Sequence, residues 1–401
     1  MARAGAAGTS SGSRPLSVVL AGGGSGGHVI PLLALADCLC REDPLTQIVA
    51  LGTTEGLESR LVPERGYRLA VVPKVPLPRR PSVDLVRLPG RLGGAVSAAQ
   101  GVIRGTDVVV GFGGYVSAPA YLAAKRARVP IVVHEANARP GFANRLGARL
   151  TPYVAVATQG TPLARARHLG MPLRTAITGL DRLARRAEAR AAFGLHPDRR
   201  TLLVTGGSLG AQRLNETFGA LAEDLGAADI QVLHVAGAGK AVPGVADRPG
   251  DGSACADRAR VDRSGENGRP PYVVVPFVDR MELAFAAADL VVCRGGANTV
   301  AEVTAVGLPA VYVPLPVGNG EQRLNAEPVV AAGGGLLVDD AALTTEWVRR
   351  AVIELVRDDV RLEAMAAASA RHGVKDGDVR LAALVREAAS ARKPASARGL
   401  T

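Results

Sequence analysis

Short apolar runs alternate with longer amphipathic stretches along most of this chain. In the first half the apolar runs fall at residues 16–21, 48–51, 71–73, 107–110 and 131–134. Buried parallel strands read as short continuous apolar runs, and the stretches between them have the 3.6-residue period of helices. The alternation predicts an α/β fold in which helices cover a doubly wound parallel sheet.

The same pattern restarts in the second half, with further strands predicted at residues 201–205, 232–236, 272–276, 290–293 and 310–314. In each half the first strand runs into a glycine-rich turn and then a helix, which is typical of Rossmann-like domains. We therefore expect two such domains facing a cleft. The length of 401 residues agrees, because a single core stops growing near roughly 250–300 residues.

The predicted organisation is a disordered leader at 1–14, an N-terminal domain at 15–173, a C-terminal domain at 174–375, a terminal helix at 376–390 and a disordered tail at 391–401. Residues 238–270 are rich in Gly, Pro, Asp and Arg and have almost no apolar periodicity. We interpret this segment as a surface insertion or a disordered loop.

The formal net charge of +11 indicates an anionic partner, either nucleic acid, a phosphate-rich substrate or an anionic membrane surface. Arg far outnumbers Lys, and a high-GC genome would also produce such a bias. Aromatic residues make up only 3% of the chain, whereas a nucleic-acid-binding protein would need aromatic stacking platforms or a basic recognition helix. We therefore expect no nucleic acid partner.

The four cysteines have no C-x-x-C spacing, which indicates buried thiols in a reducing compartment. No run reaches the roughly 18–20 apolar residues of a transmembrane helix, so we expect a soluble protein whose membrane contact is peripheral. Residues 74–104 are a candidate for that contact, although an arginine-faced surface helix would have the same pattern. The interleaved basic and apolar residues are Arg79, Arg80, Arg87, Arg91 and Arg104 with Leu77, Leu85, Leu88 and Leu92.

The first glycine turn, GGGSGG at 22–27, satisfies G-x-G-x-x-G between a strand and a helix. Its backbone N–H groups and the helix N-terminus favour a diphosphate. A nicotinamide dehydrogenase would place an acid at the end of the second strand, but that strand ends Leu51-Gly52-Thr53, with Glu55 only beyond it. The turn therefore predicts phosphate binding and little more.

His28 directly follows this turn at the start of the predicted helix. A helix N-terminus disfavours imidazolium, so His28 is a candidate general base, with simple packing as the alternative. A second glycine turn, GFGGY at 111–115, and the sequence HEAN at 134–137 end neighbouring strands at the same sheet edge. HEAN either lines the site or forms a polar loop with capping side chains.

In the second half, TGGS at 205–208 opens another helix and could hold a second phosphate group. Arg174 either adds positive charge there or is a solvated surface residue. Glu302 is either a carboxylate that accepts both ribose hydroxyls or, with Thr299, a capping box. The acid and amide side chains of 320–325 could bind sugar hydroxyls or cap a helix.

No metal cluster appears in the sequence, and we expect no cofactor. The only D-x-D string, at 376–378, lies far from every glycine turn and is interpreted as a turn and cap. Helix termini and arginine would therefore have to stabilise a leaving diphosphate.

Six motifs in order, GGGSGGH, GFGGYVS, HEAN, TGGSLGAQRLNE, CRGGANTVAE and GNGEQRLNA, resemble the MurG family over about residues 15–390. This family comprises UDP-N-acetylglucosamine:undecaprenyl-pyrophosphoryl-muramoyl-pentapeptide N-acetylglucosaminyltransferases of the GT-B fold. The resemblance implies an inverting transfer to the acceptor 4-hydroxyl in peptidoglycan synthesis, at the cytoplasmic face of the bacterial membrane. Its implied partners are UDP-N-acetylglucosamine, the lipid-linked muramoyl-pentapeptide, an anionic membrane surface, and cell-wall synthesis and division proteins.

The resemblance also implies site residues. His28 is the candidate catalytic base. Donor contacts would come from Asn137 (transferred sugar), Arg174 and Ser208 (diphosphate), Val278 (uracil), Ala297 and Gln322 (sugar) and Glu302 (ribose). The acceptor diphosphate would lie at Gly24, Ser25, Gly26, Gly27, Gly113, Gly114 and Tyr115.

The chain departs from the family pattern at several positions. The family usually has Gln at the positions of Leu209 and Glu321, and often G-N-P where residues 170–172 read GMP. Leu209 removes an amide expected near the donor phosphates. The alternatives are another GT-B transferase or a UDP-sugar epimerase of that fold, and the two glycine turns of the first half argue against an epimerase.

Overall fold

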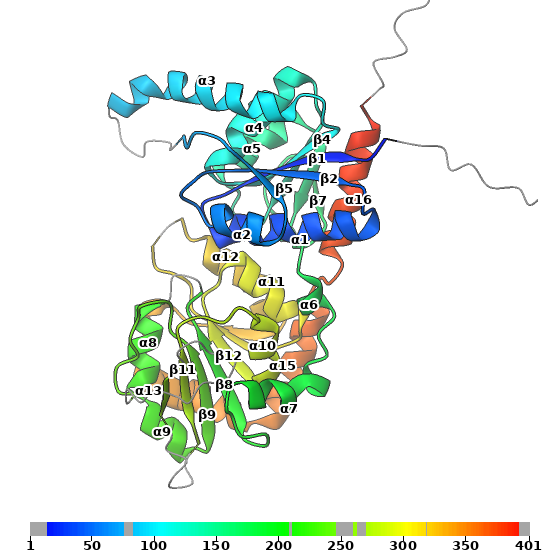
Figure 1. Ribbon diagram of the computed structural model, residues 1–401. Helices are drawn as coiled ribbons and strands as arrows, with labels where there is room; N and C mark the ends of the chain where they lie inside the picture. The colour runs from blue at the N-terminus through cyan, green and yellow to red at the C-terminus, as the bar shows by residue number, and fades with distance from the viewer. Residues whose placement is uncertain are drawn as a thin grey trace, which may run out of the picture.

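The computed structural model describes residues 14–75, 83–207, 211–245, 260–262, 270–317 and 319–392. Strands and helices alternate and build two α/β units stacked along the long axis of the molecule (Figure 1). Each unit contains one seven-stranded sheet. The prediction of two doubly wound sheets is therefore confirmed.

The first sheet is entirely parallel, with strand order β3-β2-β1-β4-β5-β6-β7. Helices α1, α2 and α16 pack on one face and α3, α4 and α5 on the other, because alternate residues of the central strands are apolar on both sides. The bounds are β1 Ser17–Gly22, α1 Gly26–Glu42, β2 Gln47–Gly52, α2 Glu58–Glu64, β3 Arg68–Val71, α3 Val83–Ile103, β4 Val108–Gly113, α4 Gly114–Ala127, β5 Ile131–Glu135, α5 Phe142–Leu150, β6 Tyr153–Val156 and β7 Ala166–His168.

The second sheet has the order β10-β11-β9-β8-β12-β13-β14, and only the edge strand β10 runs antiparallel. The elements in the second half of the chain are α6 Thr175–Thr178, α7 Arg182–Ala192, β8 Arg200–Thr205, α8 Gln212–Gly219, α9 Ala222–Ala227, β9 Ile230–Val235, β10 Arg260–Asp262, β11 Tyr272–Val275, α10 Met281–Ala287, β12 Leu290–Cys293, α11 Ala297–Ala305, β13 Ala310–Tyr312, α12 Glu321–Ala331, β14 Gly335–Leu337, α13 Thr345–Val348, α14 Glu354–Arg357, α15 Asp359–His372 and α16 Gly377–Ser390.

Several predicted elements need correction. The third strand is Arg68–Val71, ahead of the predicted 71–73, and the 238–270 segment contributes the edge strand β10 instead of being only a loop. Strands β6, β7 and β14 were not predicted. The leader up to residue 13, residues 246–259 and 263–269 of the insertion, and the tail from 393 lie outside the described residues.

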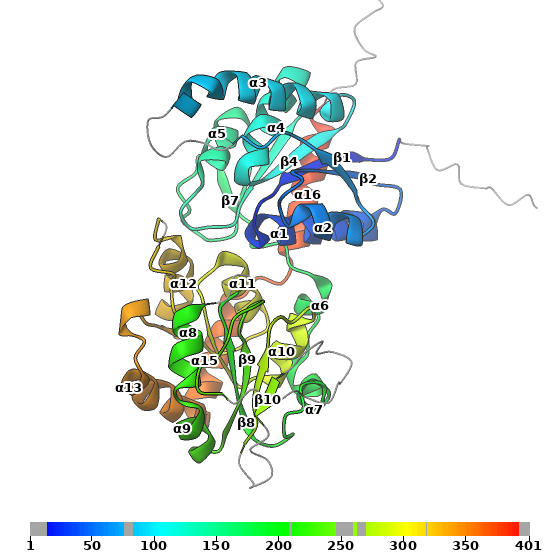
Figure 2. The same ribbon diagram turned by 60° about the vertical axis from the view of Figure 1, so that its left-hand side comes forward.

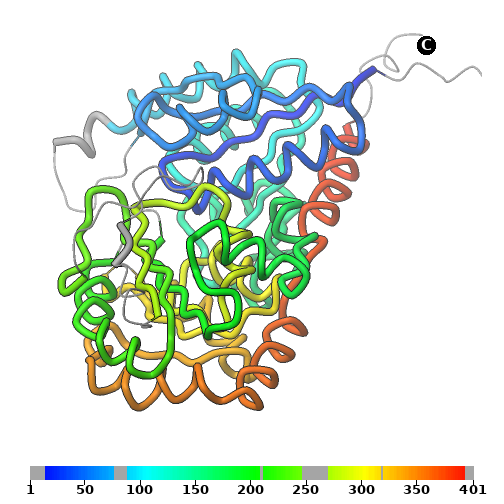
Figure 3. Tube along the Cα trace, turned by 60° about the horizontal axis from the view of Figure 1, so that its bottom comes forward, coloured from blue at the N-terminus to red at the C-terminus, as the bar shows by residue number. Residues whose placement is uncertain are grey.

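The last helix, α16, returns to the first unit and packs along α1 (Figure 3). Asp378 at its start accepts a hydrogen bond from Arg41 of α1 at 2.9 Å, and Glu387 pairs with Arg167 at 2.7 Å. Asp376 occupies the N-cap position, so the D-x-D string is indeed a turn at a helix start. The chain thus crosses between the units twice, before α6 and before α16.

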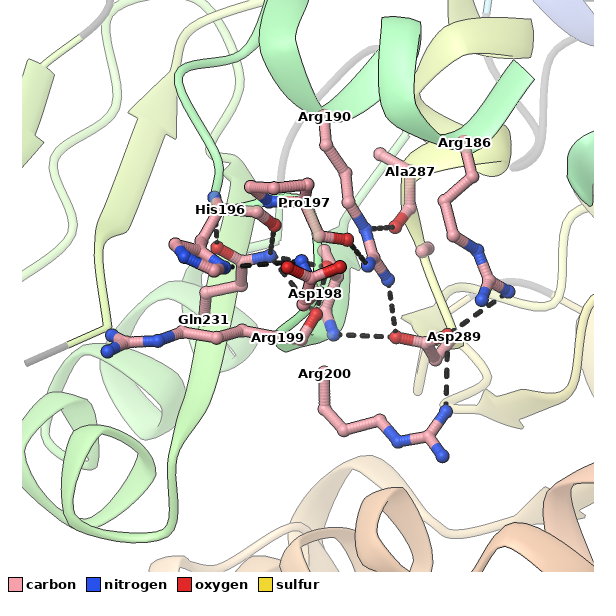
Figure 4. Close-up of polar contacts among 12 residues, drawn as sticks. Arg186, Arg190, His196, Pro197, Asp198, Arg199, Arg200, Gln231, Ala287 and Asp289 are labelled. Atoms are coloured by element: carbon pink, nitrogen blue, oxygen red, sulfur yellow. Dashed lines mark hydrogen bonds and ion pairs between the residues drawn. The ribbon is translucent and has the colours of Figure 1, made fainter. Parts of the chain in front are cut away.

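A buried charge cluster fixes the amino end of the second sheet, away from the glycine turns. Asp289 precedes β12 and accepts hydrogen bonds from Thr201 N–H at 2.8 Å and Arg190 at 2.9 Å. Arg186 and Arg200 also point at this carboxylate (Figure 4). Since the side chains of Arg190 and Asp289 are only 4% and 3% exposed, this cluster is part of the structural core.

Among the described cysteines, Cys38 and Cys293 are buried free thiols, as predicted, whereas Cys40 is partly exposed. Cys255 lies outside the described residues. None of the helices in the described ranges has the length and apolarity needed to cross a bilayer.

Candidate active site

The carboxyl ends of the two sheets meet where α1 of the first unit faces α11 of the second (Figure 2). Two asparagines bridge this boundary. Asn298 donates a hydrogen bond to Gly26 O at 3.0 Å, and Oδ1 of Asn325 accepts one from Ala138 N–H at 2.8 Å. The first glycine turn and the loop after β5 therefore lie directly against the second unit.

His28 is the third residue of α1, and its Nδ1 lies 3.2 Å from Gly23 O and 3.2 Å from Ser25 Oγ. A carbonyl oxygen can only accept, so the contact with Gly23 O favours the tautomer in which Nδ1 carries the proton and Nε2 keeps its lone pair. Burial lowers the pKa of His28, although Glu135, the Gly23 carbonyl and Glu58 act in the opposite direction. The neutral imidazole is therefore able to accept a proton at Nε2.

The second glycine turn packs against this imidazole. Gly113 and Gly114 have φ values of 101° and 78°, which favour glycine. A Cβ at Gly113 would lie 3.0 Å from His28 Nε2, and one at Gly114 would lie 2.6 Å from Gly23 O. The expectation that the two glycine turns adjoin is confirmed, and Tyr115, 44% exposed, follows them at the start of α4.

Glu135 organises the loop after β5. Its carboxylate accepts hydrogen bonds from Asn137 N–H at 2.9 Å, Gly141 N–H at 3.0 Å and Asn144 Nδ2 at 3.0 Å. Asn144 is itself held by the Tyr121 hydroxyl at 2.7 Å. Glu135 thus shapes a polar loop, as one of the two alternatives stated, and this loop carries Asn137 to the second unit.

Arg174 and Glu302 meet at the base of the second unit's site. Arg174 occupies the N-cap position of α6 without a side-chain capping hydrogen bond, and its Nη2 lies 3.6 Å from Glu302 in α11. Burial raises the pKa of Glu302, and Arg174 partly offsets this shift. The alternatives are wrong for both residues, since the Arg174 side chain is only 21% exposed and the N-cap of α11 is Gly296, which leaves Thr299 inside the helix.

The starts of α11 and α12 lie together. Ala297 is the first residue of α11, and a Cβ at the nearby Gly295 would lie 2.3 Å from Gln322 O in α12. The Oε1 of Gln322 accepts a hydrogen bond from Leu315 N–H at 3.0 Å, so its Nε2 remains to bind a ligand. Val278, 7% exposed, lies in the loop after β11.

Two predicted features cannot be placed, because Ser208 and Leu209 lie outside the described residues. Glu321 exchanges hydrogen bonds with the loop residue Asn319, which fits the helix-capping alternative for this segment. The described residues contain no group of three or more His, Cys, Asp or Glu that could hold a metal ion.

The sequence interpretation did not identify Glu58, Asn144, Asn298 or Asn325. Glu58 is completely buried and accepts a hydrogen bond from Gly24 N–H at 2.8 Å. Asn325 lies inside a noted motif, but only its contact across the two units distinguishes it from a surface amide. Such contacts depend on residues far apart in the chain and leave no local signal.

Comparisons with known proteins agree with this geometry. Residues 18–156 match the glycosyltransferase family 28 N-terminal domain, and residues 201–381 match the glycosyltransferase family 28 C-terminal domain. The UDP-N-acetylglucosamine–N-acetylmuramyl-(pentapeptide) pyrophosphoryl-undecaprenol N-acetylglucosamine transferase of Streptomyces avermitilis is 56% identical over 379 residues, which span 94% of this chain and 99% of that protein. The Mycobacterium bovis transferase of the same name is 54% identical over 395 residues, covering 94% and 92%.

Solved structures show the same arrangement. The crystal structure of Acinetobacter baumannii MurG has a TM-score of 0.69 at 25% identity and covers 93% of this chain and 100% of its own. The calicheamicin glycosyltransferase CalG4, at 18% identity, a TM-score of 0.63 and coverages of 95% and 100%, shares the fold alone. The chain belongs to the MurG family of glycosyltransferases, within glycosyltransferase family 28.

Proposed function

We propose that this chain is an N-acetylglucosamine transferase that moves the sugar from UDP-N-acetylglucosamine to the muramoyl 4-hydroxyl of undecaprenyl-pyrophosphoryl-muramoyl-pentapeptide (lipid I), giving lipid II and UDP. The substrates are those in the names of relatives that are 54–56% identical over 94% of the chain. The observation that supports the chemistry is the free Nε2 of His28, which lies against Gly113 where the strand ends of both units meet.

In the proposed reaction the acceptor oxygen attacks the anomeric carbon while His28 Nε2 takes the hydroxyl proton. The bond from that carbon to the diphosphate oxygen breaks, and UDP leaves with the electron pair. A single displacement inverts the anomeric centre and gives a β-linkage. Arg174, Ser208 and the start of α8 would stabilise the developing charge on the leaving diphosphate.

The donor would lie in the second unit, residues 174–375. Glu302 would accept the ribose hydroxyls, and Val278 would lie against the uracil. Ala297, Gln322 and Asn137 would surround the transferred sugar. In the absence of donor, Glu302 is paired with Arg174. The ribose hydroxyls of the bound donor would give this buried carboxylate further hydrogen-bond donors, which would offset the cost of burying its charge.

The acceptor would lie in the first unit, residues 15–173, with its diphosphate near Ser25, Gly26 and Gly27 and the turn at Gly113, Gly114 and Tyr115. Gly26 and Gly27 begin α1, so their N–H groups have no carbonyl partner within the helix. The N–H of Gly24 already donates to Glu58. Gly24 would therefore contribute its lack of a side chain and not a donor.

Peripheral binding to the cytoplasmic face of the membrane, through residues 74–104, follows from a lipid-linked acceptor. Arg91, within α3, and Arg104, directly after it, are exposed. Residues 76–82, with Arg79 and Arg80, and the side chain of Arg87 lie outside the described residues. Association with other cell-wall synthesis and division proteins is part of the same proposal.

The deciding experiment measures UDP release from UDP-N-acetylglucosamine with and without a short-chain lipid I analogue. Acceptor-dependent release and a product with one added β-linked sugar are expected. Binding of UDP-N-acetylglucosamine without acceptor-dependent release would reject the acceptor and direct attention to other GT-B acceptors. A Glu302→Gln variant should weaken UDP-N-acetylglucosamine binding roughly tenfold or more, because a ribose hydroxyl would face an amide donor.

A further inference from the structure

A fully buried carboxylate lies beneath the first glycine turn. Glu58, at the start of α2, is 0% exposed, and its Oε2 accepts a hydrogen bond from Gly24 N–H at 2.8 Å. Its Oε1 accepts from Thr53 N–H at 2.9 Å and from the Thr53 hydroxyl at 2.8 Å. Although burial raises it, these hydrogen bonds hold the pKa of Glu58 below its ordinary value, so the side chain is ionised.

Three glycines make room for this carboxylate. A Cβ at Gly23 would lie 2.5 Å from its Oε1, one at Gly52 2.4 Å from its Cγ, and one at Gly56 2.0 Å from its Oε2. None of these three has a positive φ. They are glycines because of the space that Glu58 occupies, and not because of backbone conformation. Two segments, the turn after β1 and the end of β2 with the loop that follows it, therefore close around a single charged group.

The Gly23–Gly24 peptide connects this carboxylate to His28. In a trans peptide the carbonyl and the N–H point in opposite directions from one plane, and the described residues contain no cis peptide bond. The N–H of Gly24 points to Glu58, and the carbonyl of Gly23 accepts from His28 Nδ1 at 3.2 Å. The direction of one bond therefore fixes the direction of the other.

We propose that Glu58 is a positioning residue for His28, acting through the Gly23–Gly24 peptide to hold the imidazole as the tautomer whose Nε2 is unprotonated. The inference rests on the proposed function only in taking His28 as the base. Donation of the Gly24 N–H to a carboxylate polarises the peptide and makes the Gly23 carbonyl a stronger acceptor. The Nδ1 proton is retained there, and the lone pair of Nε2 faces the acceptor side at Gly113.

The geometry also separates two uses of the glycine turn. One N–H, that of Gly24, serves the base through Glu58, while the first N–H groups of α1 remain for an anion. A negatively charged side chain beneath an anion-binding turn would otherwise be unfavourable. Three donors, the N–H groups of Gly24 and Thr53 and the Thr53 hydroxyl, form hydrogen bonds with the carboxylate. These bonds offset the electrostatic cost of placing a negative charge beneath the turn.

The test compares Glu58→Gln with Glu64→Gln, an exposed glutamate on the same helix that pairs with Arg60. In Glu58→Gln the side-chain oxygen would keep the Thr53 contacts, but an NH₂ group would face the Gly24 N–H, which removes the connection to His28. We expect acceptor-dependent kcat to fall at least tenfold for Glu58→Gln, within the roughly 10²–10⁴ that a general base contributes. UDP-N-acetylglucosamine binding, followed by calorimetry, should stay within twofold of the parent, and Glu64→Gln should match the parent in both.

Two further readouts distinguish positioning from simple support of the loop. In protein labelled with ¹⁵N-histidine, with His28 assigned by its loss in His28→Gln, the parent should show a protonated Nδ1 and a bare Nε2. Glu58→Gln should show a mixture of tautomers. Because Glu58 raises the pKa of His28, the acid limb of kcat/KM should move to lower pH in Glu58→Gln.

An unchanged tautomer and turnover in Glu58→Gln would overturn the proposal. If that variant does not fold, the tautomer of His28 in the parent decides the question, since a protonated Nε2 contradicts the proposed role of Glu58 directly. Failure of the proposed function is separate. It would appear as absence of acceptor-dependent UDP release by the parent. If only the proposed role of Glu58 is wrong, the parent stays active and loses activity in His28→Ala.

Discussion

Nδ2 of Asn325 donates a hydrogen bond to Oδ1 of Asn137 at 3.2 Å, across the boundary between the two units. The same side-chain amide donates to Gly295 O at 3.2 Å and accepts from Ala138 N–H at 2.8 Å. Asn325 is only 4% exposed. These contacts together fix the proposed sugar-binding Asn137 relative to the starts of α11 and α12.

We predict that Asn325→Asp lowers acceptor-dependent kcat about tenfold, because a carboxylate would face the oxygens of Asn137 and Gly295 and leave buried acceptors unpaired at a cost of about 1–3 kcal/mol. Steady-state UDP release is the measurement. Glu327→Gln, an exposed change on the same helix, should leave kcat unchanged. Equal losses of kcat for both substitutions would show that any substitution in α12 lowers kcat, and would reject a specific role for the Asn325–Asn137 contact.

Two buried histidines should make stability depend on pH. Burial lowers the pKa of His134 to about 4 and that of His234 to about 3. The unfolded chain binds protons near pH 6.5 and the folded chain does not, so stability is complete above that pH and falls as the pH drops. At pH 5 each histidine should reduce the free energy of unfolding by about 2 kcal/mol relative to pH 7.5.

Urea unfolding at the two pH values tests this, with His234→Gln as the comparison. His234 accepts from the Tyr272 hydroxyl at 2.8 Å and donates to Asn215 at 3.0 Å, so the variant should be less stable at pH 7.5. Its loss between pH 7.5 and 5 should nevertheless be smaller than that of the parent. An equal loss in both proteins would assign the pH dependence to other groups.

The alternation of apolar runs made both sheets predictable, because buried parallel strands are apolar on both faces. Strand β7, Ala166–His168, is exposed at all three residues and gave no such signal. The glycine turns and His28 could be found because their spacing is local. Glu58 could not, since it reads as an ordinary acid at a helix start and only the approach of Gly23, Gly52 and Gly56 reveals its burial.

Asp289 should be a stability residue without a role in transfer. Asp289→Ala would leave the guanidinium of Arg190 buried and uncompensated, and we expect a loss of about 3–5 kcal/mol in the free energy of unfolding. Glu327→Ala removes a carboxylate that is 48% exposed and pairs with Arg323, and it should cost about 0.5 kcal/mol or less. Thermal unfolding compares the two variants. Similar melting temperatures for both would contradict the core role of the cluster.

Gly113→Ala should reduce turnover by displacing the proposed base. The new Cβ would lie 3.0 Å from His28 Nε2, at a φ of 101° that disfavours alanine. Gly105→Ala is a matched control, because Gly105 has a φ of 86° but no atom within 4 Å of its added Cβ. Both variants place alanine at a positive φ, but Gly113, with a ψ of −167°, lies in a region that is essentially restricted to glycine, and only Gly113→Ala also crowds the imidazole. We therefore expect the larger loss of stability for Gly113→Ala and, under conditions where both variants are folded, a kcat at least tenfold lower for Gly113→Ala alone, approaching the effect of removing a general base. Equal kcat values for the two variants would mean that His28 needs no space at this turn, and would place the reacting hydroxyl elsewhere.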